Sequence, residues 1–277
     1  MKKRRRITAQ AAALALFMAG APLWAQDAAA EAAGAKVTLT GKVELKKTLT
    51  VPAGVTLDIV AKTAQLALHD GAKLTVDGTV NASGNSLEVK VNDRGNYEST
   101  TSVGIGIYGG GGRTLINGSG TIRLQSKGAL LFNVQDGHEL TLDGVTLIGL
   151  KNNDSPLVKT GTGRLYMKSG VITGNTNTGD EYWSGGGGVV VSGSDFEMEG
   201  GTITGNSAAR GGGVYIYEGQ FNMSGNASVS GNIAKNEGGG VSVGGRFSMS
   251  GNASVSGNTS MADGGGVFIR AHGSSSL

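Results

Sequence analysis

The sequence predicts an all-β fold: a right-handed single-stranded parallel β-helix of about nine rungs, each of 25–27 residues. Glycine supplies 50 of the 277 residues, well above its usual share of about 7%. The tetrapeptide Gly-Gly-Gly-Val recurs with its valines 25, 27 and 26 residues apart. Between the copies, short runs alternate apolar and polar residues, as strands do, and no helical period interrupts them. The copies are Gly186–Val189, Gly211–Val214, Gly238–Val241 and Gly264–Val267.

The first 35 residues precede the repeats. Residues 1–25 contain five basic residues at positions 2–6, a short apolar run and a small residue, Ala25, at the end. This is the pattern of a secretory signal peptide, and the apolar run is too short to span a membrane. Residues 26–35 predict a linker or a short N-terminal cap. We therefore expect a secreted or cell-surface protein.

The predicted signal also explains the positive charge of the chain. The formal net charge is +3, and without the five basic residues of the signal 19 basic residues face 21 acidic ones, a net charge of −2. A nucleic-acid partner would need a basic surface, so none is expected. Cysteine is absent, which excludes a disulfide scaffold, a zinc–thiolate site and a cysteine nucleophile. No later apolar run has the length of a transmembrane helix.

Residues 36–277 form one array, in which the 25–27-residue period is weaker upstream than downstream. Each unit predicts three short strands joined by Gly, Asn and Ser corners, since these residues tolerate the conformations of tight turns. In the second Gly-Gly-Gly-Val unit we expect Val214 and Ile216 to point inward and Tyr215 and Tyr217 to point outward. The sequence ends soon after the last such unit, so we expect the array to be incomplete or completed by another chain.

A Gly-Asn pair recurs at one corner of the units. Asparagine tolerates left-handed backbone conformations, and identical amides one rung apart can stack into a ladder. Leu150 occupies the corresponding position one unit earlier, so we expect the ladder to begin after it. The predicted ladder consists of Asn175, Asn206, Asn232 and Asn258.

The residue types that carry chemistry are scattered. His69, His138 and His272 stand in different rungs without metal-ligand spacing. Glu197 and Glu199 form a pair that the next units do not repeat, which favours a solvated face over a catalytic carboxylate pair. We therefore expect no metal, no cofactor and no catalytic cluster in the regular rungs.

Two insertions break the period, and insertions in solenoids often lie on a binding face. The one between Met167 and Met198 contains Tyr182 and Trp183. Exposed aromatic residues stack on sugar rings or anchor protein partners, although large aromatics are also often buried against their own fold. The candidate binding residues are Tyr182, Trp183, Tyr215, Tyr217 and Phe268.

The Gly-Gly-Gly-Val, Phe-x-Met and Ser/Thr-Gly-Asn units resemble right-handed parallel β-helix proteins of the pectin-lyase-like class. More narrowly, they resemble bacterial secreted or surface repeat proteins such as autotransporter passenger domains and polymorphic outer-membrane proteins. The G-G-A-[ILV] repeat of the latter is matched with Gly in place of Ala, at Gly186–Val189 for example. Their F-x-x-N repeat is not matched, because Ser224 and Ser250 stand at the Asn position. The resemblance implies surface exposure and adhesion.

Two functions follow from these observations. The first is an exported, non-enzymatic, adhesin-like β-helix that binds a glycan or a protein of a host or neighbouring cell. The alternative is a carbohydrate-active β-helix enzyme, a polysaccharide lyase or hydrolase. Its acids would come from the insertion between Val76 and Ile116, which contains Asp93 and Glu98.

Overall fold

The computed structural model describes residues 112–270, apart from residues 126, 136 and 180–184, together with nine short strands between Lys36 and Ile107. The predicted signal peptide and linker, His69, Asp93, Glu98 and His272 lie outside the described residues. So do two of the candidate binding residues, Tyr182 and Trp183.

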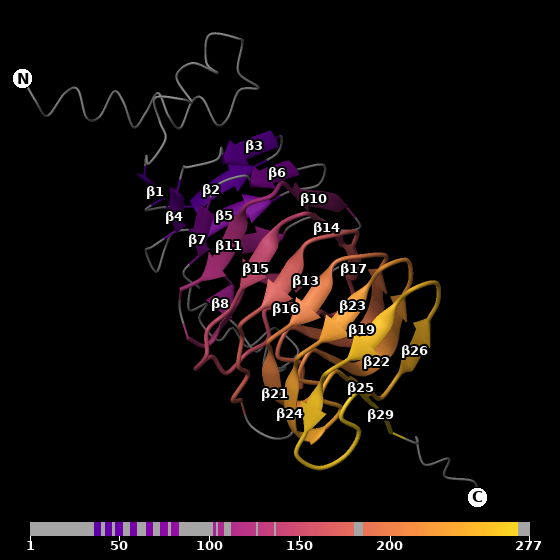
Figure 1. The fold of residues 1–277 in the computed structure, drawn as a ribbon. Helices are drawn as coiled ribbons and strands as arrows, with labels where there is room; N and C mark the ends of the chain where they lie inside the picture. The colour runs from indigo at the N-terminus through magenta and orange to yellow at the C-terminus, as the bar shows by residue number, and fades with distance from the viewer. Residues whose placement is uncertain are drawn as a thin grey trace, which may run out of the picture.

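The predicted fold class is confirmed: the chain is an all-β parallel solenoid. Strands that are neighbours in a sheet come from successive turns and pair in parallel, as Thr146–Ile148 does with Val171–Thr173 (Figure 1). The part from Gly112 to Arg270 makes about six turns, fewer than the nine expected. The expected number included the upstream units, of which the structure describes only strands.

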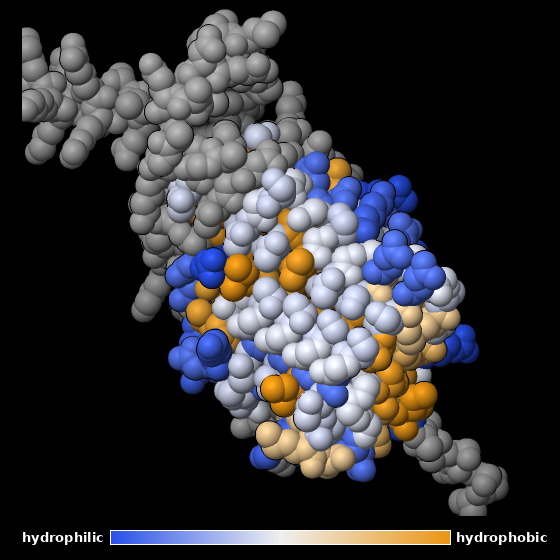
Figure 2. Space-filling model, in the orientation of Figure 1, coloured by the Kyte–Doolittle hydropathy of each residue, from blue (hydrophilic) through white to orange (hydrophobic). Residues whose placement is uncertain are grey.

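One sheet, which we call the first sheet, has nine strands. Its strands are, in spatial order, β1 (Lys36–Leu39), β4 (Thr56–Ile59), β7 (Thr79–Ala82), β11 (Thr121–Leu124), β15 (Thr146–Ile148), β18 (Val171–Thr173), β20 (Thr202–Thr204), β23 (Ser228–Ser230) and β27 (Ser254–Ser256). From β15 to β27 none of its residues is charged. Figure 2 shows mostly pale residues of intermediate hydropathy in the middle of the visible face, with some hydrophobic ones among them, strongly hydrophilic residues along much of the margin and hydrophobic ones at the lower right.

The second sheet has twelve strands. Its main path is β3 (Thr48–Val51), β6 (Lys73–Val76), β10 (Arg113–Asn117), β14 (Glu139–Asp143), β17 (Arg164–Met167), β19 (Val189–Met198), β22 (Val214–Met223), β25 (Val241–Val243) and β29 (Val267–Ile269). Pairing beside this path are β13 (Phe132–Val134), β16 (Val158–Thr160) and β26 (Arg246–Met249). The shorter sheets consist of β21 (Ser207–Arg210), β24 (Ile233–Glu237) and β28 (Thr259–Ser260); of β2 (Lys42–Leu45), β5 (Gln65–Leu68) and β9 (Ile105–Ile107); and of β8 (Ser102–Val103) and β12 (Ala129–Leu130).

The two ten-residue strands of the second sheet, β19 and β22, differ from the three short strands expected per unit. Each continues through a corner, where Gly193 and Gly219 have φ values of +110° and +90°. Their pairing shifts register between Val191 and Ser194. A glycine at positive φ lets the chain bend there without ending the strand, because it has no β-carbon to clash with the backbone.

The interior is filled by the apolar residues that alternate along each strand. In β22 the buried residues include Val214, Ile216 and Phe221, each 0% exposed. The Phe-x-Met units place one phenylalanine above another: the rings of Phe196 and Phe221 stack 4.5 Å apart at 8°, and those of Phe221 and Phe247 lie 5.4 Å apart at 31°. The repeat therefore produces an aromatic column inside the solenoid as well as an apolar core.

The recurring asparagines also stack, at the corner that follows the first sheet. The backbone N–H of Asn206 donates to Oδ1 of Asn232 (3.0 Å), and that of Asn232 donates to Oδ1 of Asn258 (2.9 Å). Oδ1 of Asn175 accepts from the backbone N–H of Leu150 and from Nδ2 of Asn153, each at 3.2 Å. The side-chain amides thus satisfy backbone groups that a buried corner would otherwise leave unpaired.

Candidate functional site

The charged residues of the second sheet gather on its outward side, where one residue per turn forms a column. Because the strands pair in parallel, residues 25 to 31 positions apart lie directly above one another. The column consists of Arg113, Glu139, Arg164, Asp195, Gln220 and Arg246.

In the upper part of this column the charges alternate and pair. Nε of Arg113 lies 2.7 Å from Oε2 of Glu139, and Nε of Arg164 lies 3.6 Å from Oδ2 of Asp195. A hydrogen bond with Tyr166, and then the charges of Tyr166 and Asp195, raise the pKa of Arg164 above its usual value, so this guanidinium stays cationic. These solvent-exposed pairs set the orientation of the side chains and add little to stability.

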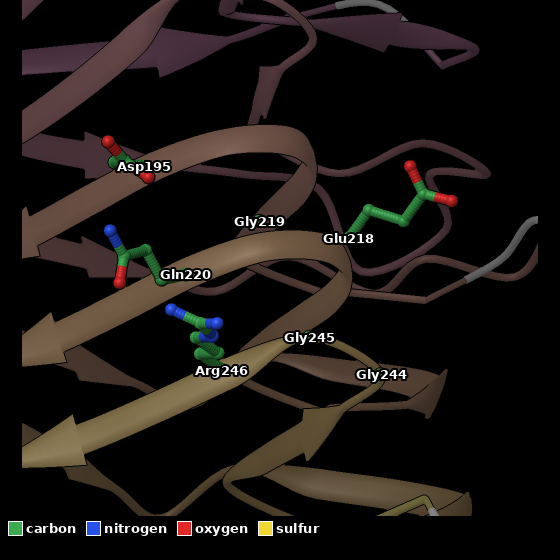
Figure 3. Close-up of a pocket in the computed structure, with 7 residues that line it drawn as sticks. All are labelled: Asp195, Glu218, Gly219, Gln220, Gly244, Gly245 and Arg246. Carbon is green, nitrogen blue, oxygen red and sulfur yellow. The ribbon is translucent and has the colours of Figure 1, made fainter. Parts of the chain in front are cut away.

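The lower part of the column borders a groove of about 600 Å³. It is lined by Asp195, Glu218, Gly219, Gln220, Gly244, Gly245 and Arg246. Figure 3 shows Asp195, Gln220 and Arg246 one below another, with Glu218 on the other side of Gly219 and Gly245. A β-carbon at Gly245 would collide with the carbonyl oxygen of Gly219. Gly245 therefore lets the backbones of two neighbouring turns approach closely at the corner that borders the groove.

The polar side chains of the groove differ in whether another described side chain pairs with them. Asp195 shares its carboxylate with Arg164. Arg246 is exposed and has no ion-pair or hydrogen-bond partner for its side chain among the described residues, and within the same residues the Gln220 amide also has none. An unpaired guanidinium beside an unpaired amide offers several N–H donors and one carbonyl acceptor to a ligand.

The aromatic candidates do not form one exposed patch. Tyr215 is 6% exposed, because its ring occupies the space into which a β-carbon at Gly185 would extend. Tyr217 is 45% exposed, its ring centroid lies 6.5 Å from that of Tyr215, and it directly precedes Glu218 of the groove. Phe268 is half-buried and lies two turns from Tyr215, with Ser242 between them in register. Of the three described aromatic candidates, only Tyr217 is exposed, and in the chain it adjoins Glu218 of the groove.

The sequence interpretation missed Gln220 and Arg246. The period of the repeat could have found them, because it places Gln220 one unit and Arg246 two units after Asp195. The residue type changes from each turn of the column to the next, however, and the interpretation searched for residues repeated in successive units.

Elsewhere, the described histidine is part of the interior. His138 is 1% exposed, and its Nε2 lies 2.8 Å from Oγ1 of Thr114. In the described part of the chain, no three or more histidine, aspartate or glutamate side chains cluster so that they could hold a metal ion. The same part contains no helix long and apolar enough to cross a membrane.

Comparisons of the chain with protein-family models, with curated proteins and with solved structures found no match. The parallel β-solenoid thus stands on the geometry described above.

Proposed function

We propose that this protein is an exported, non-enzymatic β-helix protein that binds a glycan in the groove below Asp195. The observation that carries the proposal is that a guanidinium, an amide and a carboxylate, those of Arg246, Gln220 and Asp195, lie one below another along one hollow of about 600 Å³. Carboxylates accept hydrogen bonds from sugar hydroxyls, guanidinium groups donate to them, and an amide does both. Small-molecule sites usually have a few convergent polar groups on a concave surface.

Tyr217 adds the apolar contact that a sugar ring needs. Its ring is exposed, and the residue directly precedes Glu218, which lines the groove. The faces of sugar rings expose C–H groups that pack on aromatic rings, while their hydroxyls need polar partners. An aromatic ring beside polar side chains suits a glycan better than it suits a purely apolar ligand.

Two features of the sequence support the exported part of the proposal. Residues 1–25 have the pattern of a secretory signal. The Gly-Gly-Gly-Val and Phe-x-Met units resemble pectin-lyase-like bacterial surface proteins, for which adhesion to glycans or proteins is an expected role. Fold resemblance alone does not assign a function, so the groove carries the argument.

The test is binding of the mature chain to a panel of soluble glycans, followed by calorimetry on those that bind. We expect Gln220→Ala and Tyr217→Ala each to weaken binding about tenfold, which corresponds to about 1.4 kcal/mol. Ser256→Ala, on the outward side of the first sheet, is the matched control and should bind as the parent does. Unchanged affinity in both groove variants would reject the site.

A second candidate function is a carbohydrate-active enzyme, and one observation favours it: Asp195 and Glu218 line the same groove. Glycoside hydrolysis uses two carboxyl groups on either side of the scissile bond. In Figure 3, however, the Glu218 carboxylate points away from the Asp195 column. Release of new reducing or unsaturated ends from the same glycan panel, lost in Asp195→Asn and Glu218→Gln, would establish this function in place of the first.

A further inference from the structure

The charges of the outward column are compensated at every turn but one. Arg113 faces Glu139, and Arg164 faces Asp195. The next two turns hold Gln220, which is neutral, and Arg246, which lies in register with it. Within the described part of the chain the Arg246 guanidinium has no anionic partner.

The Arg246 guanidinium, which has no anionic partner among the described residues, defines the chemistry of the ligand. A guanidinium binds a carboxylate with two parallel N–H···O bonds, which are stronger than bonds between neutral groups. The neutral amide of Gln220 can donate to the same carboxylate without repelling it. The lower end of the groove therefore accepts one negative charge.

The remaining groups of the groove oppose further negative charge. Asp195 and Glu218 are acceptors when ionised, and they suit the hydroxyls of a sugar rather than a second anion. Like charges held close together repel, and repulsion by fixed charges of the site is a common source of specificity. A polymer with a carboxylate on every sugar would meet both acidic side chains.

Resting on the proposed glycan-binding function, we infer that the ligand is a glycan that ends in a single acidic sugar. The carboxylate of that sugar lies against Arg246 and Gln220, and its neighbouring hydroxyls reach Asp195. Tyr217 stands at the rim, where the next, neutral sugar leaves the groove.

The experiment compares calorimetric binding of sialyllactose, lactose and polygalacturonate to the mature chain. Sialyllactose should bind at least tenfold more tightly than lactose, and its affinity should fall as salt is raised. Polygalacturonate should bind no more tightly than lactose. Arg246→Gln should remove the preference, so that the variant binds sialyllactose no more tightly than it binds lactose. Arg123→Gln, an exposed arginine of β11 on the first sheet, should keep the preference.

Equal binding of sialyllactose and lactose by the parent chain would overturn this inference and leave the proposed function in place. Preference for polygalacturonate, or retention of the sialyllactose preference in Arg246→Gln, would overturn it as well. Failure to bind either small glycan would also reject it, whereas the proposed function is judged separately, by the effect of Gln220→Ala and Tyr217→Ala on the wider panel. Circular dichroism of each variant checks that it folds as the parent does.

Discussion

The side-chain amide of Asn232 packs against the backbone of Gly213: a β-carbon at Gly213 would stand 2.9 Å from Nδ2 of Asn232. The next turn repeats the arrangement, with 2.7 Å between such an atom on Gly240 and Nδ2 of Asn258. The asparagine ladder and the glycine corners therefore fit together across the interior. This contact explains why the two motifs recur with the same period.

Replacement of Gly213 by alanine should destabilise the protein by about 1–3 kcal/mol, since the added methyl overpacks the interior. Urea unfolding measures the change. Gly266→Ala is the matched control, because Gly266 holds the same place in the last described corner and a β-carbon there would meet only Val255 Cγ1, at 3.8 Å. The control should stay within about 0.5 kcal/mol of the parent. Equal losses in the two variants would show that the contact with Asn232 is not the cause.

Removal of the side-chain amide of Asn232 should destabilise the protein more than Gly213→Ala does. Asn232→Ala leaves the buried N–H of Asn206 and the carbonyl oxygen of Ile203 without their side-chain partner. Each buried unsatisfied group costs about 1–3 kcal/mol, so a loss of several kcal/mol is expected in chemical denaturation. Asn252→Ala, which removes an exposed hydrogen bond of 3.3 Å to Asn226, should change stability by less than about 0.5 kcal/mol.

The aromatic column gives a third prediction. Phe221 is fully buried between Phe196 and Phe247, so Phe221→Ala should lower the free energy of unfolding by about 3–5 kcal/mol through lost burial and a cavity. Phe247 is only half-buried, and Phe247→Ala should lower it by a smaller amount. The prediction fails if thermal unfolding finds Phe247→Ala the more damaging change.

Ser242 gives a prediction of the opposite sign. It is 0% exposed, and among the described residues its Oγ has no hydrogen-bond partner. A buried hydroxyl without a partner costs free energy, so Ser242→Ala should leave the denaturation midpoint unchanged or raise stability by about 1 kcal/mol. Ser228→Ala, at a half-buried position of the first sheet, should have little effect. A clear loss of stability in Ser242→Ala would show that the hydroxyl has a partner in solution.

Much of this architecture could be predicted because the period and the alternation act locally. A repeat of 25–27 residues with strand-like alternation places Val214 and Ile216 inside and stacks Asn206 on Asn232, whatever the details of the corners. The burial of the Tyr215 ring could not be predicted in the same way. Alternation places a side chain on the outward face, but here the segment at Gly185 packs over that face and buries the ring.

The groove could not be predicted from the sequence for a related reason. Its shape depends on the bends at Gly193 and Gly219 and on the register shift after Val191. Together these decide which residue of the next turn lies in register with Asp195. Glycine is abundant throughout the chain, so composition does not show which glycines bend a strand and which only turn a corner.

The ladder asparagines Asn206 and Asn232 bond within their own rung and to the neighbouring rungs, with Asn206 donating to Asn232 and Asn232 to Asn258 in the same way. Loss of the whole stretch from Gly225 to Ser250 would bring Asn206 against Asn258 with the same donors and acceptors. The molecule can thus lengthen or shorten by complete repeats without redesign, whereas insertion of one residue at this corner would break the ladder. A gene for such a chain can change by unequal duplication in steps of one rung, each step leaving the interior intact and shifting only the composition of the outer face.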